Sequence, residues 1–157
     1  MLIFGMQLDK FTDYGLRALI YLRLCGARRA SVAEIAAKFD LSEHHLSKVA
    51  TALAADGFVV SSRGRAGGLS LAKPAKDISI GAVVRRLTRN VAVAECFAQN
   101  GACAISPACG LRGPLAEAQE AFFKVLDGYN LADVSGQGAA LSKLLGVDDP
   151  SALDETV

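Results

Sequence analysis

Three cysteines lie close together in the stretch ECFAQNGACAISPAC, residues 95–109, which we call the cysteine segment. Cys96, Cys103 and Cys109 have the spacing C-x6-C-x5-C and are three of the four cysteines in the chain. An odd number of thiols cannot all pair as disulfides within the segment. Three thiols are also one fewer than a closed tetrahedral metal site requires. On a loop that contains Gly and Pro, these thiolates could surround a small inorganic centre.

The residues around the three thiols favour iron over zinc. Structural zinc sites use four Cys or His ligands, often in C-x2-C pairs. The segment has no such pair, and the only two histidines of the chain, His44 and His45, are distant in sequence. Iron–sulfur clusters prefer thiolates and accept another ligand at one iron. A [4Fe–4S] or [2Fe–2S] cluster is therefore one hypothesis, beside three thiols in a core loop and a redox switch through a disulfide.

Composition indicates a chain with a hydrophobic core and no membrane span. It has 157 residues, 52% of them apolar, which suits one or two small domains. No apolar run approaches the roughly 18 residues of a transmembrane helix. The apolar start MLIFGMQL lacks the basic region and cleavage site of a signal peptide. We therefore expect a cytoplasmic protein with reduced thiols, in which Cys25, the fourth cysteine, is a small buried side chain.

The two parts of the chain carry opposite net charges. Residues 1–90 contain 14 Lys and Arg against 7 Asp and Glu, a balance of +7. Residues 91–157 contain 3 against 9, a balance of −6, and the two balances sum to the chain's +1. This asymmetry favours a polyanionic partner, namely nucleic acid, for the first part only.

Helical patterns in the basic part predict a helix-turn-helix. Apolar residues recur at helical spacing over residues 12–25, with Thr12 as the expected N-cap. Ser31 and Glu34 form the S-x-x-E capping box that begins a second helix. Ser42 can cap a third helix, EHHLSKVATALAADG, which Gly57 should end. The inner face of this third helix is expected to consist of Leu46, Val49, Ala50 and Leu53.

The stretch FVVSSRGRAGGLSLAKP, which follows directly, predicts a β-hairpin. Two short β-prone runs flank a Gly-rich tip that carries Arg63 and Arg65. A helix-turn-helix followed by a basic hairpin is the winged-helix arrangement. Glycines let the backbone approach a phosphate, and arginines supply charge or enter the minor groove, so we predict that both arginines contact DNA.

The N-terminal residues of the third helix are the expected readers of the major groove. The polar residues at this end are Ser42, Glu43, His44, His45, Ser47 and Lys48. We assign Ser42, His44, His45 and Lys48 to DNA contacts. Adjacent positions on a helix point about 100° apart, so His44 and His45 are not expected to share a metal ion.

The acidic part of the chain predicts a long amphipathic helix. A short helix capped by Ser79 comes first, then the cysteine segment, and then a helical pattern over residues 114–134. One side of that pattern carries Leu115, Ala118, Phe122, Val125, Leu126 and Tyr129. This apolar side could pack on a second subunit, and the Gly-, Asp- and Ser-rich tail from residue 135 is expected to fray.

The predicted fold class is therefore mainly α with a small β-hairpin wing. We expect a winged helix-turn-helix domain over residues 6–90 and the cysteine segment with a dimerisation helix over residues 91–134. Residues 135–157 are expected to form a partly flexible tail.

Several stretches together resemble one family of regulators. The residues are FTDYGLRALIYL, SSRGRAGG, LAKPAKDISIGAVVRRL and SPACGLRGPL, and the resemblance covers residues 6–145. They are similar to the Rrf-type winged-helix iron–sulfur transcriptional regulators, and within them most similar to the repressors that sense nitric oxide. Cluster-assembly regulators of the family have a His three residues after the last Cys, where this chain has Arg112. Iron-responsive members have a longer gap after the first Cys.

The resemblance implies a homodimeric repressor of a double-stranded DNA operator rather than an enzyme. It implies that Cys96, Cys103 and Cys109 hold the cluster and that nitric oxide is the signal. It also implies that Asp13 ligates the cluster of the other subunit, although Glu95 is a second carboxylate near the thiols. Three alternatives stay open: a sensor of iron or cluster status from the same family, a thiol-based redox regulator, and a cluster-carrying protein that ignores DNA.

Overall fold

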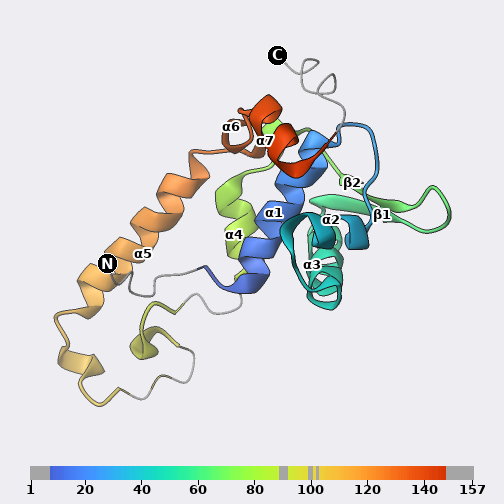
Figure 1. Cartoon of the computed structure of the whole chain (residues 1–157). Helices are drawn as coiled ribbons and strands as arrows, with labels where there is room; N and C mark the ends of the chain where they lie inside the picture. The colour runs from blue at the N-terminus through green and yellow to red at the C-terminus, as the bar shows by residue number, and fades with distance from the viewer. Residues whose placement is uncertain (1–7, 89–91, 99–100, 102, 148–157) are drawn as a thin grey trace.

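The computed structural model describes residues 8–88, 92–98, 101 and 103–147, and it shows a mainly helical fold with one β-hairpin (Figure 1). The elements are α1 (Lys10–Leu24), α2 (Val32–Phe39), α3 (Glu43–Ala55), β1 (Val59–Ser62), β2 (Gly68–Leu71), η1 (Ala75–Asp77), α4 (Ile80–Leu87), η2 (Glu95–Phe97), η3 (Ser106–Ala108), α5 (Arg112–Asp127), α6 (Leu131–Val134) and α7 (Gly138–Leu145). The predicted fold class is confirmed. The predicted division into three parts stays a prediction, and its outer ends lie outside the described residues.

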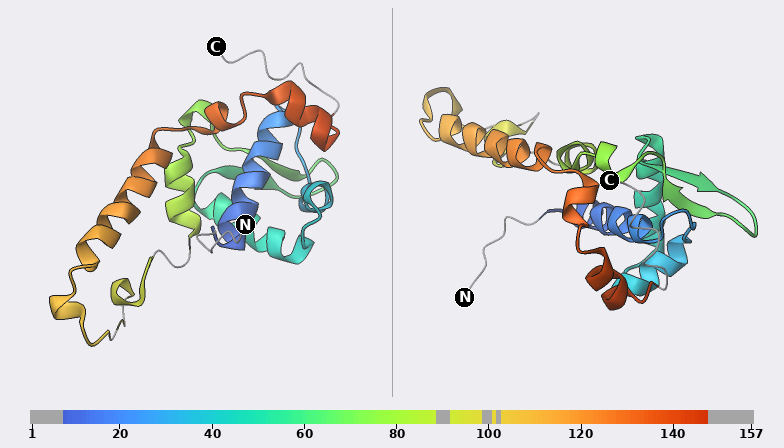
Figure 2. Two further views of the ribbon diagram at one scale, coloured as in Figure 1. Left: turned by 60° about the vertical axis from the view of Figure 1, so that its left-hand side comes forward. Right: turned by 90° about the horizontal axis from the view of Figure 1, so that it is seen from above.

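Helix α1 is the centre of the body. Its side chains Leu19, Leu22 and Leu24 are fully buried, and it packs against α3 and α4. Helix α5 instead projects from the body on the side opposite the hairpin, as both views of Figure 2 show. None of the described helices is long and apolar enough to cross a membrane.

Helix α1 begins earlier than the sequence predicts. Its N-cap is Asp9, whose carboxylate accepts hydrogen bonds from the backbone nitrogen of Thr12 at 2.9 Å and from its hydroxyl at 3.0 Å. The prediction of Thr12 as the N-cap is wrong, because an acidic side chain three residues upstream accepts the first free N–H groups. Thr12 is instead buried in the first turn.

The two helices of the helix-turn-helix begin at the predicted caps. The Ser31 hydroxyl accepts from the backbone nitrogen of Glu34, and the Ser42 hydroxyl accepts from that of His45. The predicted inner face of α3 is buried. Asp40 ends α2 in the left-handed conformation, and Gly57, with a φ of 73°, follows α3.

The hairpin pairs antiparallel from Val59 opposite Leu71 to Ser62 opposite Gly68. A third segment extends it, because Ala30 and Leu69 exchange backbone hydrogen bonds of 3.0 and 2.8 Å. We define the wing as residues 59–71. The loop before α2 is thus attached to the wing near the start of β2, in the half of the hairpin next to its tip.

The predicted helix over residues 114–134 is two helices in the structure. Helix α5 ends at Asp127, and Asn130 begins α6 with a capping box to Asp133. The break follows from a tertiary contact, since the backbone nitrogen of Ile80 donates to the carbonyl of Tyr129. That carbonyl is therefore taken by another element rather than by a continuing helix.

Helix α7 is an element that the sequence did not predict. It lies in the stretch expected to fray, packs against α1, and buries Ser142 and Val147. Gly146 caps it in the left-handed conformation, and Lys38 of α2 donates to the Gly146 carbonyl at 3.2 Å. The rest of the predicted tail, residues 148–157, lies outside the described residues.

Candidate nucleic-acid interface and cysteine segment

The first turns of α3 present polar side chains to solvent. Ser42, His44, His45 and Lys48 are all exposed, as are Glu43 and Ser47 beside them. Leu46, on the opposite side of the helix, is fully buried and fixes its rotation. The rings of His44 and His45 lie 6.0 Å apart. The side chains predicted to read a major groove are thus accessible, and their contacts with DNA stay a prediction.

The tip of the wing also carries its predicted residues outward. Arg63 and Arg65 are exposed on either side of Gly64, whose φ is 103°. Gly68 has a φ of 136°, and a side chain there would crowd the Ala30 carbonyl. The tip is thus a tight turn that only glycines allow, with two guanidinium groups free to contact phosphates.

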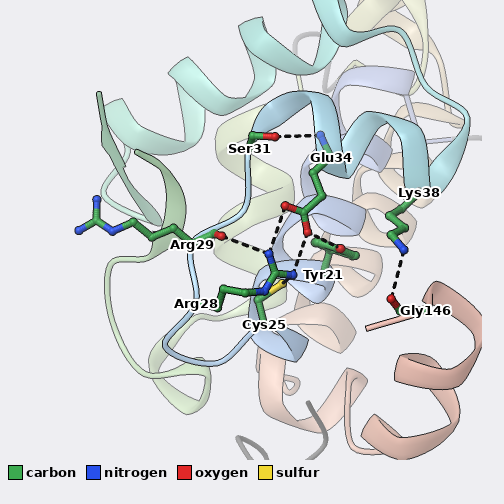
Figure 3. Close-up of polar contacts among 8 residues, drawn as sticks. All are labelled: Tyr21, Cys25, Arg28, Arg29, Ser31, Glu34, Lys38 and Gly146. Carbon is green, nitrogen blue, oxygen red and sulfur yellow. Dashed lines mark hydrogen bonds and ion pairs between the residues drawn. The ribbon is translucent and has the colours of Figure 1, made fainter. Parts of the chain in front are cut away.

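A third arginine lies beside the start of β2 and was missed by the sequence analysis. Arg29 is exposed and precedes Ala30, the residue that pairs with β2. Its side chain points away from the body (Figure 3). The two adjacent arginines, Arg28 and Arg29, could have indicated a basic DNA-contacting surface in the sequence. Only the pairing of Ala30 with the wing, however, places Arg29 beside the other arginines.

A polar network fastens the N-terminal half of α2 to α1 (Figure 3). The Tyr21 hydroxyl donates to Glu34 at 2.7 Å, and Arg28 donates to both Glu34 oxygens, at 2.8 and 3.2 Å. The Arg28 guanidinium holds the pKa of the Glu34 carboxyl below its usual range. Burial, and then the bond to Glu34, raise the pKa of Tyr21 to about 12.

Cys25 belongs to this network rather than to the cysteine segment. Its sulfur accepts from Nη2 of Arg28 at 3.1 Å, and the side chain is buried. Burial raises the pKa of the thiol, although the Arg28 guanidinium acts in the opposite direction. The buried thiol expected at this position is what the structure shows.

The cysteine segment connects α4 to α5 and contains two single 3-10 turns. Cys96 lies in η2, Cys109 ends η3, and Cys103 lies between the turns. All three are free and partly exposed. The Arg112 guanidinium lies 5.8 Å from the centre of the Phe97 ring, so the start of α5 contacts the turn that holds Cys96.

The described residues contain no group of three or more His, Cys, Asp or Glu side chains placed to hold a metal ion. The donor set nevertheless fits an iron–sulfur cluster chemically, because it offers three free thiols on an irregular segment. Gathering them around one centre would require the segment to fold further. The cluster and its ligands therefore remain a prediction.

Asp13 lies in the first turn of α1 and is already paired. Its carboxylate accepts from Nε of Arg17 at 3.2 Å and lies 2.8 Å from Nη2. Both side chains are more than a third exposed. A role of Asp13 as a ligand would require this i,i+4 ion pair to open.

Helix α5 exposes large apolar side chains. Among the residues of α5 that the structure describes, only Phe123 is buried. Val125 is 62% exposed, and Tyr129, which follows the helix, is 51% exposed. Phe122 lies on the same side and is also exposed. A solvent-exposed apolar helix side of this kind is typical of a surface that a partner covers.

Comparison with known proteins identifies relatives over nearly the whole chain. The profile of the Rrf2 family, described as an iron-dependent transcriptional regulator, matches residues 8–137. The HTH-type transcriptional regulator NsrR of Geobacillus kaustophilus is 46% identical over 142 residues, which are 89% of this chain and 97% of that relative.

Solved structures of the same kind superpose on the chain. The global cysteine regulator CymR of B. subtilis matches with a TM-score of 0.67 and 25% identity, over 85% of this chain and 98% of its own. The IscR of T. potens matches with a TM-score of 0.68 and 25% identity, over 85% of this chain and 88% of its own. CymR of Staphylococcus aureus in its oxidized form matches with a TM-score of 0.66 and 27% identity, over 83% of this chain and 96% of its own.

Proposed function

Since this chain belongs to the Rrf2 family of transcriptional regulators, we propose that it represses transcription by binding an operator as a homodimer and releases the DNA when nitric oxide reaches an iron–sulfur cluster. The observation that carries the proposal is the set of three free, partly exposed thiols between α4 and the projecting helix α5. The resemblance to the nitric-oxide-sensing repressors supplies the signal.

The DNA-binding step uses two surfaces. The exposed end of α3, with Ser42, His44, His45 and Lys48, enters the major groove and contacts base edges or nearby phosphates. The wing places Arg63 and Arg65 on the backbone or in the minor groove. Two copies related by a two-fold axis would place two α3 helices in half-sites about one turn of DNA apart.

The sensing step uses the cysteine segment. Cys96, Cys103 and Cys109 would hold a [4Fe–4S] or [2Fe–2S] cluster, which when bound supplies iron that reacts with nitric oxide. While the three thiolates are held, the segment has one shape and α5 has one direction. When the thiolates are released the segment relaxes, and the ordered dimer geometry loses its energetic advantage over others. DNA affinity then falls.

Asp13 is the proposed fourth ligand, donated to the other subunit's cluster. A carboxylate binds iron more weakly than a thiolate and is easily displaced. In Asp13→Ala we expect the cluster to stay bound by three cysteines, with shifted absorption and circular-dichroism spectra and a changed rate of reaction with nitric oxide. Wild-type spectra and rates in that variant would exclude Asp13 as the fourth ligand. Glu95, water or a small thiol would then remain as candidates for that ligand.

An anaerobic DNA-binding titration tests the proposed function. The reconstituted protein is titrated onto operator DNA with and without stoichiometric nitric oxide, and we expect at least a tenfold loss of affinity with it. Cys96→Ala, Cys103→Ala and Cys109→Ala should each lose iron, whereas Cys25→Ala should retain it. Unchanged DNA affinity in nitric oxide would exclude the signal, and wild-type iron content in one of the three variants would exclude that ligand.

A thiol switch is the second candidate. It is favoured by the three free thiols, which in the described structure are not gathered into a metal site, and by the similarity to a CymR solved in an oxidized form. A colourless, iron-free protein whose DNA affinity responds to an oxidant would support this candidate. Response to iron supply but not to nitric oxide would instead support the sensor of iron or cluster status.

A further inference from the structure

Helix α5 is fastened to the body at one end only. Its buried side chain, Phe123, lies in its last turns, while the earlier turns project beyond the body (Figure 1). The cysteine segment ends where α5 begins, because the nitrogen of Arg112 donates to the carbonyl of Cys109 at 3.4 Å. A change of shape in the segment therefore acts on the far end of α5, about 17 Å along the helix from Phe123 and about 23 Å from Asp127 at 1.5 Å per residue.

The attachment itself is made by α4. Arg85 forms a two-pronged ion pair with Asp127, in which Nη2 lies 2.7 Å from Oδ2 and Nη1 contacts Oδ1. The same guanidinium lies 4.6 Å from the centre of the Phe123 ring. Phe123 and Asp127 are four residues apart on one side of α5, so a single side chain contacts that helix at two points on the same side.

Gly81 lets the two helices meet closely. A Cβ atom at position 81 would overlap Oδ1 of Asp127 and lie 2.9 Å from its backbone nitrogen. Just beyond this contact, before α4 and after α5, Ile80 donates to the Tyr129 carbonyl at 3.0 Å and Leu131 donates to the Ile78 carbonyl at 2.9 Å. These backbone bonds leave the end of α5 little freedom to slide along α4.

The opposite end of α4 reaches the recognition helix through α1. Leu87 is buried and packs onto Gly15 so closely that a Cβ atom there would overlap its Cδ1. The same hypothetical Cβ atom would lie 3.5 Å from Cγ1 of Val49, on the inner face of α3. Gly15 is thus the point where α4, α1 and α3 meet.

From these contacts we infer that α4 couples the cysteine segment to the recognition helix, and that Arg85 and Gly81 are the positioning residues of this coupling. The inference rests on the proposed function for its biological meaning. Helix α4 is eight residues long and packs closely at both ends, so a tilt of α5 is passed on as a movement of α4 rather than absorbed between the helices. A shift of 2 Å at the tip of α5 corresponds to a tilt of about 5–7°.

The coupling can be measured without the cluster, by using cadmium(II) to gather the three thiolates. We expect cadmium to change the hydrogen exchange of residues 46–55 in α3 and to change operator affinity at least fivefold in the wild type. In Arg85→Ala and Asp127→Asn both responses should fall below twofold, although cadmium still binds. Arg85→Lys, which keeps the charge but not the two-pronged pair, should restore part of the response.

Two controls separate coupling from loss of structure. Lys124→Ala changes an exposed residue of the same turn of α5 and should respond as the wild type does. Gly81→Ala should behave like Arg85→Ala, and if it does not fold, the Arg85 and Asp127 variants carry the test. Hydrogen exchange of residues 123–131 reports whether the attachment has loosened.

The outcomes distinguish this inference from the proposed function. A full cadmium response in Arg85→Ala with a loosened attachment overturns the coupling through α4. An absent response in the wild type overturns it as well, whereas the nitric oxide titration still decides the proposed function. If the coupling is observed but nitric oxide leaves DNA affinity unchanged, the proposed signal fails and the coupling stands.

Discussion

The Glu34 side chain does not make the capping-box hydrogen bond that the S-x-x-E motif predicts for it. In a complete capping box the glutamate would bond back to the N-cap nitrogen, but here its carboxylate accepts from Tyr21 and Arg28. The capping-box prediction is therefore confirmed for Ser31 only. The departure ties α2 to α1, since the buried Tyr21 hydroxyl and the exposed Arg28 guanidinium both donate to the carboxylate.

The network predicts a specific dependence of stability on pH. The pKa of Glu34 is lowered in the folded state, so its stabilisation is present above the unfolded value of about 4.3 and is lost as pH falls through the folded value. We expect Glu34→Gln to unfold about 1 kcal/mol more easily at pH 7. The difference between variant and wild type, measured by urea denaturation, should shrink steadily below about pH 4.

Tyr21 extends the same test to alkaline pH. Its pKa is raised to about 12, so its contribution is complete below the unfolded value of about 10 and is lost as pH rises through the folded value. Absorbance of tyrosinate should therefore show a step near pH 12 that is missing in Tyr21→Phe. If the wild type shows no step near pH 12 that Tyr21→Phe lacks, the buried hydroxyl is not bonded as described.

Cys25 provides a second prediction at the residue scale. Burial blocks access to its sulfur and raises the pKa of its thiol, so little thiolate is present at neutral pH. N-ethylmaleimide should label three cysteines rapidly and Cys25 at least tenfold more slowly, as peptide mass spectrometry can show. In guanidinium chloride all four should react alike, and rapid labelling of Cys25 in the native protein would contradict its placement.

At the scale of elements, the wing should supply sequence-independent DNA affinity. Arg63 and Arg65 are exposed on the hairpin turn, and Arg29 is exposed on the loop paired with β2. Each phosphate contact that is lost should lower the slope of log affinity against log salt by about one. We expect Arg65→Ala to weaken specific and random DNA equally. His45→Ala should instead weaken specific DNA more, because α3 faces the bases.

Each of these DNA-binding predictions has an outcome that would contradict it. Wild-type affinity in Arg63→Ala, Arg65→Ala and the double variant would show that the wing does not engage DNA. Equal losses on specific and random DNA in His45→Ala would make that residue a phosphate contact. Arg29→Ala should weaken DNA binding as the wing variants do if the loop beside β2 touches the duplex. Unchanged DNA affinity in Arg29→Ala would mean that Arg29 makes no contact with the DNA.

Most elements could be predicted because their signals are local. Ser31, Ser42 and Ser79 cap the helices that follow them, and the glycines of the wing mark a turn that other residues cannot make. The end of α5 could not be predicted, because the apolar periodicity continues past Asp127 while the bond from Ile80 to Tyr129 joins distant parts of the chain. Arg29, Arg85 and α7 were missed for the same reason, since each takes its role from a contact with another element.

At the scale of the whole molecule, α5 is too exposed to be explained by one copy of the chain. It projects from the body with Phe122 and Val125 facing solvent, and Tyr129 follows on the same side. The predicted dimer would cover this side and would also bring Asp13 of one copy toward the cysteine segment of the other. A dimer built on α5 therefore explains the exposed surface and meets the need for two recognition helices at fixed separation.

The dimer is tested by placing a charge on that surface. Val125 is 62% exposed in the single chain, so Val125→Asp should leave the fold of each copy intact while burying a carboxylate at the interface. We expect the dimer dissociation constant from sedimentation equilibrium to rise at least tenfold and affinity for a two-half-site operator to fall with it. Leu144→Asp is the matched control, because Leu144 is a still more exposed leucine on α7, away from α5. Equal dimerisation of both variants would show that the two copies meet elsewhere, and then the path from α5 through α4 to α3 would act within one subunit alone.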